Sequence, residues 1–118
     1  MKSARTLPAV LLLSSLTALT VAAECKKPPL PQIPDGAQAS EDRMLAVQSE
    51  VADFIAEGRQ YLNCIKNEEA ALATNASDDE RRSIVNRYNA MIDNMKTTST
   101  RFNKAVNDYQ KTLEEEAE

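Results

Sequence analysis

Few side chains in this sequence have the type and spacing that chemistry requires. Met91 and Met95 stand four residues apart, so on a helix their thioethers would share one face, where they could hold a soft ion such as Cu(I). Asp53 and Glu57 have the same spacing and are the kind of carboxylate pair used in acid–base catalysis. The chain has no histidine, the commonest general base and metal ligand. We therefore expect no enzyme activity, no metal site and no cofactor, and we expect both methionines to be core residues.

Cys25 and Cys64 are the two cysteines of the chain. In an exported protein such a pair most often forms a disulfide, which would stabilise the fold by roughly 4 kcal/mol by closing a loop of about 40 residues. Two free thiols, or a bond between chains, are the alternatives. A catalytic thiol is not expected, because the chain offers no histidine to hold it as a thiolate.

The first 23 residues have the layout of a secretory signal peptide: basic residues, an apolar stretch, and small residues that end at Ala23. We predict cleavage after about Ala23 and export from the cytoplasm. The apolar stretch is short for a membrane anchor, and Glu24 directly before Cys25 disfavours a lipoprotein. Cleavage leaves 95 residues and lowers the net charge from −4 to −6. We expect this acidic chain neither to bind nucleic acid nor to insert into a membrane.

Residues 24–39 contain four prolines, which exclude the interior of a helix or a sheet. We predict an extended, proline-rich strap that ends in a turn at Asp35 and Gly36. A disulfide at Cys25 would fold the strap back along the first helix. A ligand for a proline-binding domain is the alternative to such a packed segment.

Two helices are expected, over about residues 40–73 and 78–115, because apolar residues recur at steps of three and four. Ser77 and Glu80 have the spacing of a capping box that opens the second helix. A short loop makes long helices antiparallel neighbours, so residues 40–118 are predicted to form an all-α, coiled-coil-like two-helix hairpin. The predicted seam between the helices consists of Val51, Phe54, Gly58, Tyr61, Ile65, Tyr88, Ile92, Met95, Phe102, Val106 and Tyr109, and it extends to Val85 and Leu113.

The seam also predicts a register and a second face. With a turn near Ala76, facing residues have numbers that add to about 153, so Gly58 should lie opposite Met95. Residues directly after the seam positions mix apolar and asparagine side chains. They form either a solvated surface or a contact face for a partner or a second protomer. This partner face consists of Leu45, Ile55, Leu62, Asn86, Asn89, Asn103 and Asn107.

Four short motifs carry a resemblance to other proteins: Cys25 with its prolines, Tyr61-Leu62-x-Cys64, Tyr88-Asn89-Ala90 and Phe102-Asn103-x-Ala105-Val106. With these motifs the chain resembles a group of small, uncharacterised exported helical proteins of proteobacteria. The resemblance implies a periplasmic setting and a disulfide, and it brings no active-site or binding residues. We expect a non-enzymatic interaction or scaffolding protein of the cell envelope, with a protein partner or self-association as a homodimer. A holdase-like chaperone that binds unfolded clients on the partner face is the alternative.

Overall fold

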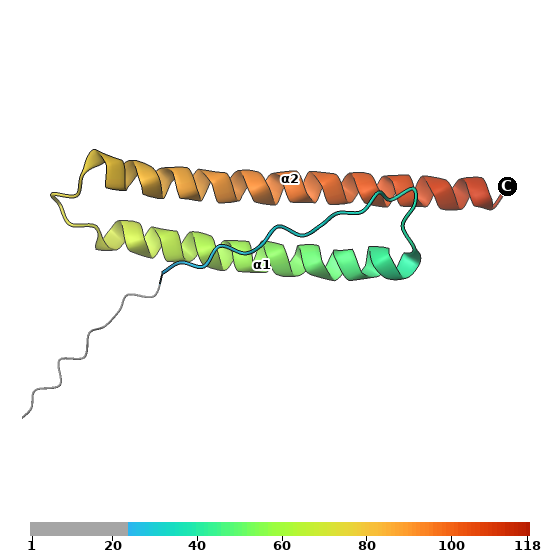
Figure 1. The fold of residues 1–118 in the computed structure, drawn as a ribbon, viewed down its shortest axis with the longest axis horizontal. Helices are drawn as coiled ribbons and strands as arrows, with labels where there is room; N and C mark the ends of the chain where they lie inside the picture. Colours follow the sequence, from blue (N-terminus) through green and yellow to red (C-terminus); the bar gives the residue numbers. More distant parts are fainter. Residues whose placement is uncertain (1–23) are drawn as a thin grey trace, which may run out of the picture.

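The computed structural model describes residues 24–118, and the predicted signal peptide lies outside them. Helix α1 spans Glu41–Ala71 and helix α2 spans Asp78–Glu116, with a short loop between them. The two helices lie side by side and antiparallel, and the described part of the chain contains no strand (Figure 1). The predicted all-α helical hairpin is therefore confirmed. Among the described residues, no helix combines the length and apolar character needed to cross a membrane.

Side-chain caps define where both helices begin. At the start of α1, the Ser40 hydroxyl accepts a hydrogen bond of 3.2 Å from the Arg43 N–H. At the start of α2, the Ser77 hydroxyl accepts a bond of 3.1 Å from the Glu80 N–H. In return, the Glu80 carboxylate accepts a bond of 2.8 Å from the Ser77 N–H. The predicted capping box is thus confirmed, and it satisfies two of the N–H groups that a helix start leaves without partners.

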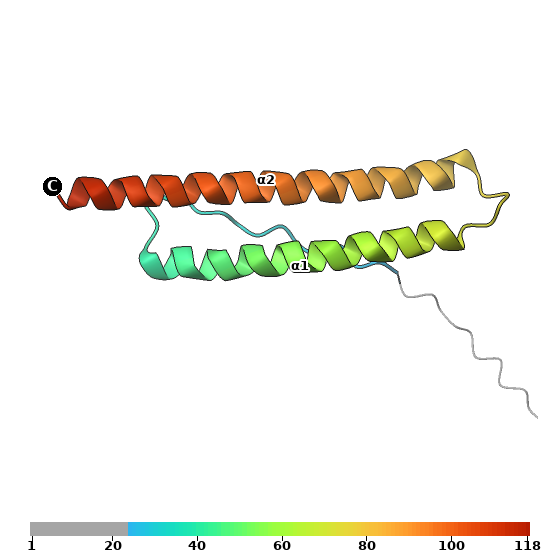
Figure 2. The ribbon, with the colours of Figure 1, turned by 180° about the vertical axis from the view of Figure 1, so that it is seen from behind.

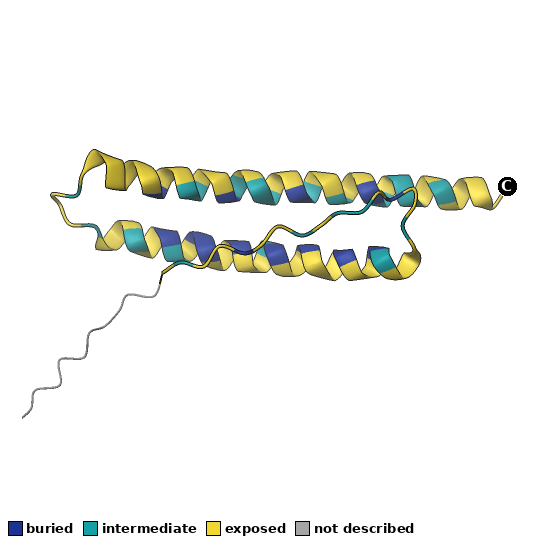
Figure 3. Ribbon diagram, in the orientation of Figure 1, coloured by how far each residue is buried: buried dark blue, intermediate teal, exposed yellow. Residues whose placement is uncertain are grey.

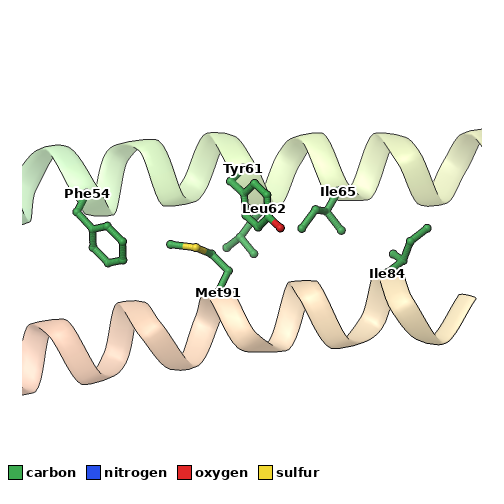
Figure 4. Packing of buried hydrophobic residues seen from close by; sticks show 6 residues of the cluster. All are labelled: Phe54, Tyr61, Leu62, Ile65, Ile84 and Met91. Carbon is green, nitrogen blue, oxygen red and sulfur yellow. The ribbon is translucent and has the colours of Figure 1, made fainter. Parts of the chain in front are cut away.

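Two clusters of buried side chains fill the space between the helices. The cluster nearer the loop joins four residues of α1 to two of α2: Phe54, Tyr61, Leu62, Ile65, Ile84 and Met91 (Figure 4). The cluster nearer the open end joins Met44, Val47 and Val51 of α1 to Ala105 of α2. Both clusters use the side of α1 that the sequence pattern assigned to the seam.

On α2 the buried line differs from the predicted seam by about one residue. Its buried residues are Ile84, Met91, Thr98 and Ala105, which repeat every seven positions. The predicted seam residues Tyr88, Ile92, Met95, Phe102, Val106 and Tyr109 are half-buried. Val85 and Leu113, which the pattern also placed in the seam, are 50% and 46% exposed.

At Thr98 and Ala105 the shift on α2 follows from a third element, the strap. The strap crosses one face of the hairpin and meets α2 near Ala105 before it turns back to the start of α1 (Figure 1). From behind, the strap lies beyond the helices (Figure 2). Because the strap covers only one side of the seam, α2 residues on that side lose more contact with water than those on the other. Two helices alone would bury the residues on both sides of the α2 seam to the same extent.

Several contacts hold the strap against the helices. Pro28 and Gly36 are buried. The Arg43 guanidinium donates a hydrogen bond of 2.8 Å to the Gln32 carbonyl oxygen. The Thr112 hydroxyl lies 3.5 Å from the Ala37 carbonyl oxygen. The strap thus contacts both helices.

Candidate functional site: two faces of the hairpin

The strap begins at a disulfide on α1. Cys25 and Cys64 are bonded, with their Cα atoms 5.6 Å apart and 39 positions between them in the sequence. The bond leaves no free cysteine among the described residues. It fixes the N-terminal end of the strap to the last third of α1, nearer the loop than the free ends of the helices. This selects the pairing within one chain from the alternatives that the sequence left open.

An ion pair stands beside the disulfide and joins the two helices. The Arg87 guanidinium of α2 donates to both carboxylate oxygens of Glu68 on α1. This hydrogen bond is the largest influence that lowers the pKa of Glu68 below its ordinary value, and the positive charge of Arg87 and the backbone N–H of Cys25 lower it further. Glu68 therefore interacts with α2 and with the first residue of the bridge at once.

The groups that the sequence offered for metal or acid–base chemistry lie at the disulfide, in the core and on the surface. Both sulfurs of the disulfide and a carboxylate oxygen of Glu68 lie within 4.8 Å of one another, but bonded sulfurs are not thiolate ligands. Met91 is fully buried, and its methyl group fills the space in front of Gly58 together with Met95. The predicted Gly58–Met95 contact is thereby confirmed. Asp53 and Glu57 are exposed.

The two faces of the hairpin differ in what covers them. Buried residues gather on the facing sides of α1 and α2, and exposed residues cover the outer sides (Figure 3). One face carries the strap. The opposite face, which we name the open face, carries two hollows lined by residues of the helices alone.

The larger hollow of the open face lies toward the free ends of the helices. Apolar side chains form its floor, and amides stand around them. This open-end hollow is lined chiefly by Leu45, Gln48, Asn103, Val106, Gln110 and Leu113, with Glu41 at its end. Leu45 is 56% exposed. An exposed leucine beside a second one in a hollow is the kind of surface that a protein partner covers.

A smaller hollow lies toward the loop. This loop-end hollow is lined by Lys66, Glu69, Ile84, Val85, Tyr88 and Asn89. The Lys66 ammonium lies over the ring of Tyr88, 5.7 Å from its centre, within the range of a cation–π contact. Val85 is half exposed beside them.

The predicted partner face corresponds only in part to the open face. Leu45 and Asn103 line the open-end hollow, and Asn89 lines the loop-end hollow. Ile55 is half-buried, and Asn86 and Asn107 are exposed outside both hollows. The assignment of Leu62 to the partner face is wrong. Leu62 is 8% exposed and belongs to the core cluster, so a partner cannot contact it.

Sequence reasoning missed two residues of this region. Val85 was assigned to the seam and instead lines a hollow on the surface. Arg87 had no assigned role, although Glu68 occupies a seam position where an apolar residue would be usual. A charged residue at such a position signals a partner of opposite charge on the facing helix.

Comparisons of the chain with protein-family models, with curated proteins and with solved structures gave no match. The proposals below therefore rest on the geometry and chemistry of this chain alone.

Proposed function

We propose that this protein is a non-enzymatic helical interaction protein of the cell envelope, which binds a protein partner through its open face. The observation that supports this proposal is the asymmetry between the two faces. The strap covers one side of the seam, whereas Leu45, Val85 and Leu113 on the open face remain about half exposed. Apolar side chains left uncovered in this way favour association with another protein surface.

An exported, periplasmic location fits the chemistry of the chain. Disulfides form and persist outside the reducing cytosol, and Cys25 and Cys64 are bonded. The N-terminal pattern of residues 1–23 is that of a signal peptide. The chain lacks histidine, and its carboxylates at Asp53 and Glu57 are exposed, which favours binding over catalysis.

The test is photo-crosslinking in living cells. A photoreactive amino acid replaces Leu45 on the open face or, as the matched control, Leu30 on the strap, which is exposed to nearly the same degree (58% against 56%). We expect a discrete crosslinked protein from position 45 and none from position 30. The same protein should co-purify with the unaltered chain and be lost with Leu45→Glu. Equal crosslinking from both positions would contradict the proposal.

A holdase-like chaperone is the second candidate, and the amides around the open-end hollow favour it. Gln48, Asn103 and Gln110 can hydrogen-bond to the backbone of an extended client while its apolar side chains contact Leu45 and Leu113. The unaltered protein should then suppress aggregation of several unrelated unfolded proteins, and Leu45→Asp should abolish the effect. Failure to protect any client would leave the interaction protein as the function.

A further inference from the structure

Four charges of the open face are arranged symmetrically about one level of the hairpin. On α1, Glu41 and Arg59 lie nine positions on either side of residue 50. On α2, Glu114 and Lys96 lie nine positions on either side of residue 105. At a rise of 1.5 Å per residue, each charge is about 14 Å from its centre. All four side chains are exposed.

These four charges belong to the open face and form two levels. Glu41 lines the open-end hollow. Helical spacing places Glu114 on the side of Gln110 and Arg59 on the side of Ile55, each four positions away, and Lys96 lies seven positions from Asn103. The Gly58–Met95 contact sets Arg59 level with Lys96 and Glu41 level with Glu114. The open face is thus acidic at the free ends of the helices and basic near the middle.

Apolar residues follow the same symmetry. Leu45, which lines the open-end hollow, and the half-buried Ile55 lie five positions on either side of residue 50. A surface whose acids and bases stand equally far from one level, on opposite sides of it, is complementary to itself after a half-turn.

We infer that the open-end hollow is covered by a second copy of this chain, stacked face to face and antiparallel. This inference rests on the proposed function and names the partner of the open face. The twofold axis runs across both helices at the level of residues 50 and 105, so that α1 lies on the partner's α1 and α2 on the partner's α2. Glu41 then approaches Arg59 of the partner subunit, and Glu114 approaches Lys96 of the partner subunit. Leu45 meets Ile55 of the partner subunit.

The area available matches a specific but weak dimer. The overlap runs from Glu41 to Arg59 on α1, which is 19 residues, or about 28 Å of helix. Two neighbouring helices are about 18 Å wide. Each copy would therefore cover on the order of 500 Å², or about 1,000 Å² in total, at the lower limit of specific interfaces. The loop-end hollow with Val85 stays outside the overlap, free for another protein.

Sedimentation equilibrium of the exported protein, from about 1 µM to 500 µM, tests the inference. We expect a reversible monomer–dimer equilibrium with a Kd in the micromolar range. Leu45→Glu places two charges in the interface, one from each copy, and should raise the Kd at least about 100-fold. Leu30→Glu and Val85→Glu, at positions exposed by 58% and 50%, are matched controls outside the interface and should leave the Kd unchanged.

A charge exchange tests the orientation. Lys96→Glu and Glu114→Lys should each raise the Kd about tenfold, because each variant sets like charges against one another twice. The two changes together restore opposite pairs and should return the Kd to within about threefold of the original. A chain that is monomeric at 500 µM, or a double variant no better than either single one, would overturn the dimer. If position 45 nevertheless crosslinks to a different protein in cells, the proposed function stands without the dimer.

Discussion

At the scale of single residues, Glu68 connects α1 to α2 and to the disulfide. Its carboxylate accepts from Arg87 on the other helix and lies beside the sulfurs of the Cys25–Cys64 bond. The side chains of the pair are 33% and 37% exposed, so water screens the interaction and its contribution to stability is modest. Its value lies in specificity, because it holds α1, α2 and the start of the strap in one register.

The pH dependence of this pair is the first prediction. The pKa of Glu68 is lower in the folded protein than its ordinary value. The pair therefore stabilises the fold fully above that ordinary value, and the contribution is lost as the pH falls through the folded-state pKa. A double-mutant cycle of Glu68→Gln and Arg87→Gln, measured by urea unfolding, should give a coupling energy of up to about 1 kcal/mol at pH 7. The coupling energy should be smaller at pH 3 than at pH 7, and equal coupling at both pH values would contradict the assignment.

The two glycines make a matched pair for the second prediction. A Cβ at Gly58 would lie 2.7 Å from the terminal methyl group of Met91, which can move away, and alanine favours a helix by about 1 kcal/mol. A Cβ at Gly36 would collide with the backbone carbonyl of Ala105, which cannot move. Gly58→Ala should therefore change the free energy of unfolding by less than about 1 kcal/mol, and Gly36→Ala should lower it by about 1–3 kcal/mol. Equal effects in urea unfolding would show that the strap does not approach α2 at Gly36.

The two leucines of the predicted partner face supply the third prediction. Leu62 is in the core and Leu45 is on the surface. Leu62→Asp should destabilise the protein by about 3–5 kcal/mol, because it leaves a cavity and buries a charge. Leu45→Asp should change the stability of the monomer by no more than about 0.5 kcal/mol. Thermal unfolding of dilute protein measures both, and comparable losses would contradict the two assignments.

At the scale of elements, the strap makes a two-helix hairpin into a three-element domain. It covers the side of α2 that carries Thr98 and Ala105, where a helix pair alone would leave a groove. Because Cys25 is bonded to Cys64, the unfolded chain is already restricted, and part of the entropy cost of ordering the strap is removed from folding. Small domains with little core commonly depend on such a bridge.

Loss of the bridge is the fourth prediction. The double variant Cys25→Ser and Cys64→Ser should lower the free energy of unfolding by roughly 4 kcal/mol, because the unfolded chain regains the freedom of a 39-residue loop. In a reducing agent, the unaltered protein should have the same free energy of unfolding as the double variant. The agent should not change the free energy of unfolding of the double variant. A reduced protein as stable as the oxidised one would contradict the stabilising role of the bridge.

Element by element, the sequence carried most of the information about the hairpin. The sequence predicted the two helices from apolar residues at steps of three and four, the start of α2 from a capping box at Ser77, and the pairing of Gly58 with Met95. The exact buried line on α2 could not be predicted, because it depends on where a strap without regular structure settles. The same cause explains Leu62 and Val85, which lie at the edges of the seam, where a small rotation of either helix exchanges core and surface.

At the scale of the whole molecule, the two faces have opposite chemistry. One is occupied by the chain's own strap, and the other retains exposed Leu45, Val85 and Leu113 between amides and charges. The candidate site could be predicted from sequence only as a mixed apolar and asparagine stripe. Its true extent depends on which flank of the seam the strap covers, and that is set by contacts distant in sequence, such as Gly36 with Ala105.

The most direct test of this two-faced arrangement is solvent paramagnetic relaxation of methyl groups, measured by NMR on protein dilute enough to be monomeric. The methyl groups of Val47 and Met91, which are fully buried, should be protected from a soluble paramagnetic agent. Those of Leu45, Val85 and Leu113 should relax as strongly as the methyl groups of the exposed Leu30. Strong relaxation of Met91, or protection of Leu45, Val85 and Leu113 in the monomer, would contradict a hairpin closed on one face and open on the other.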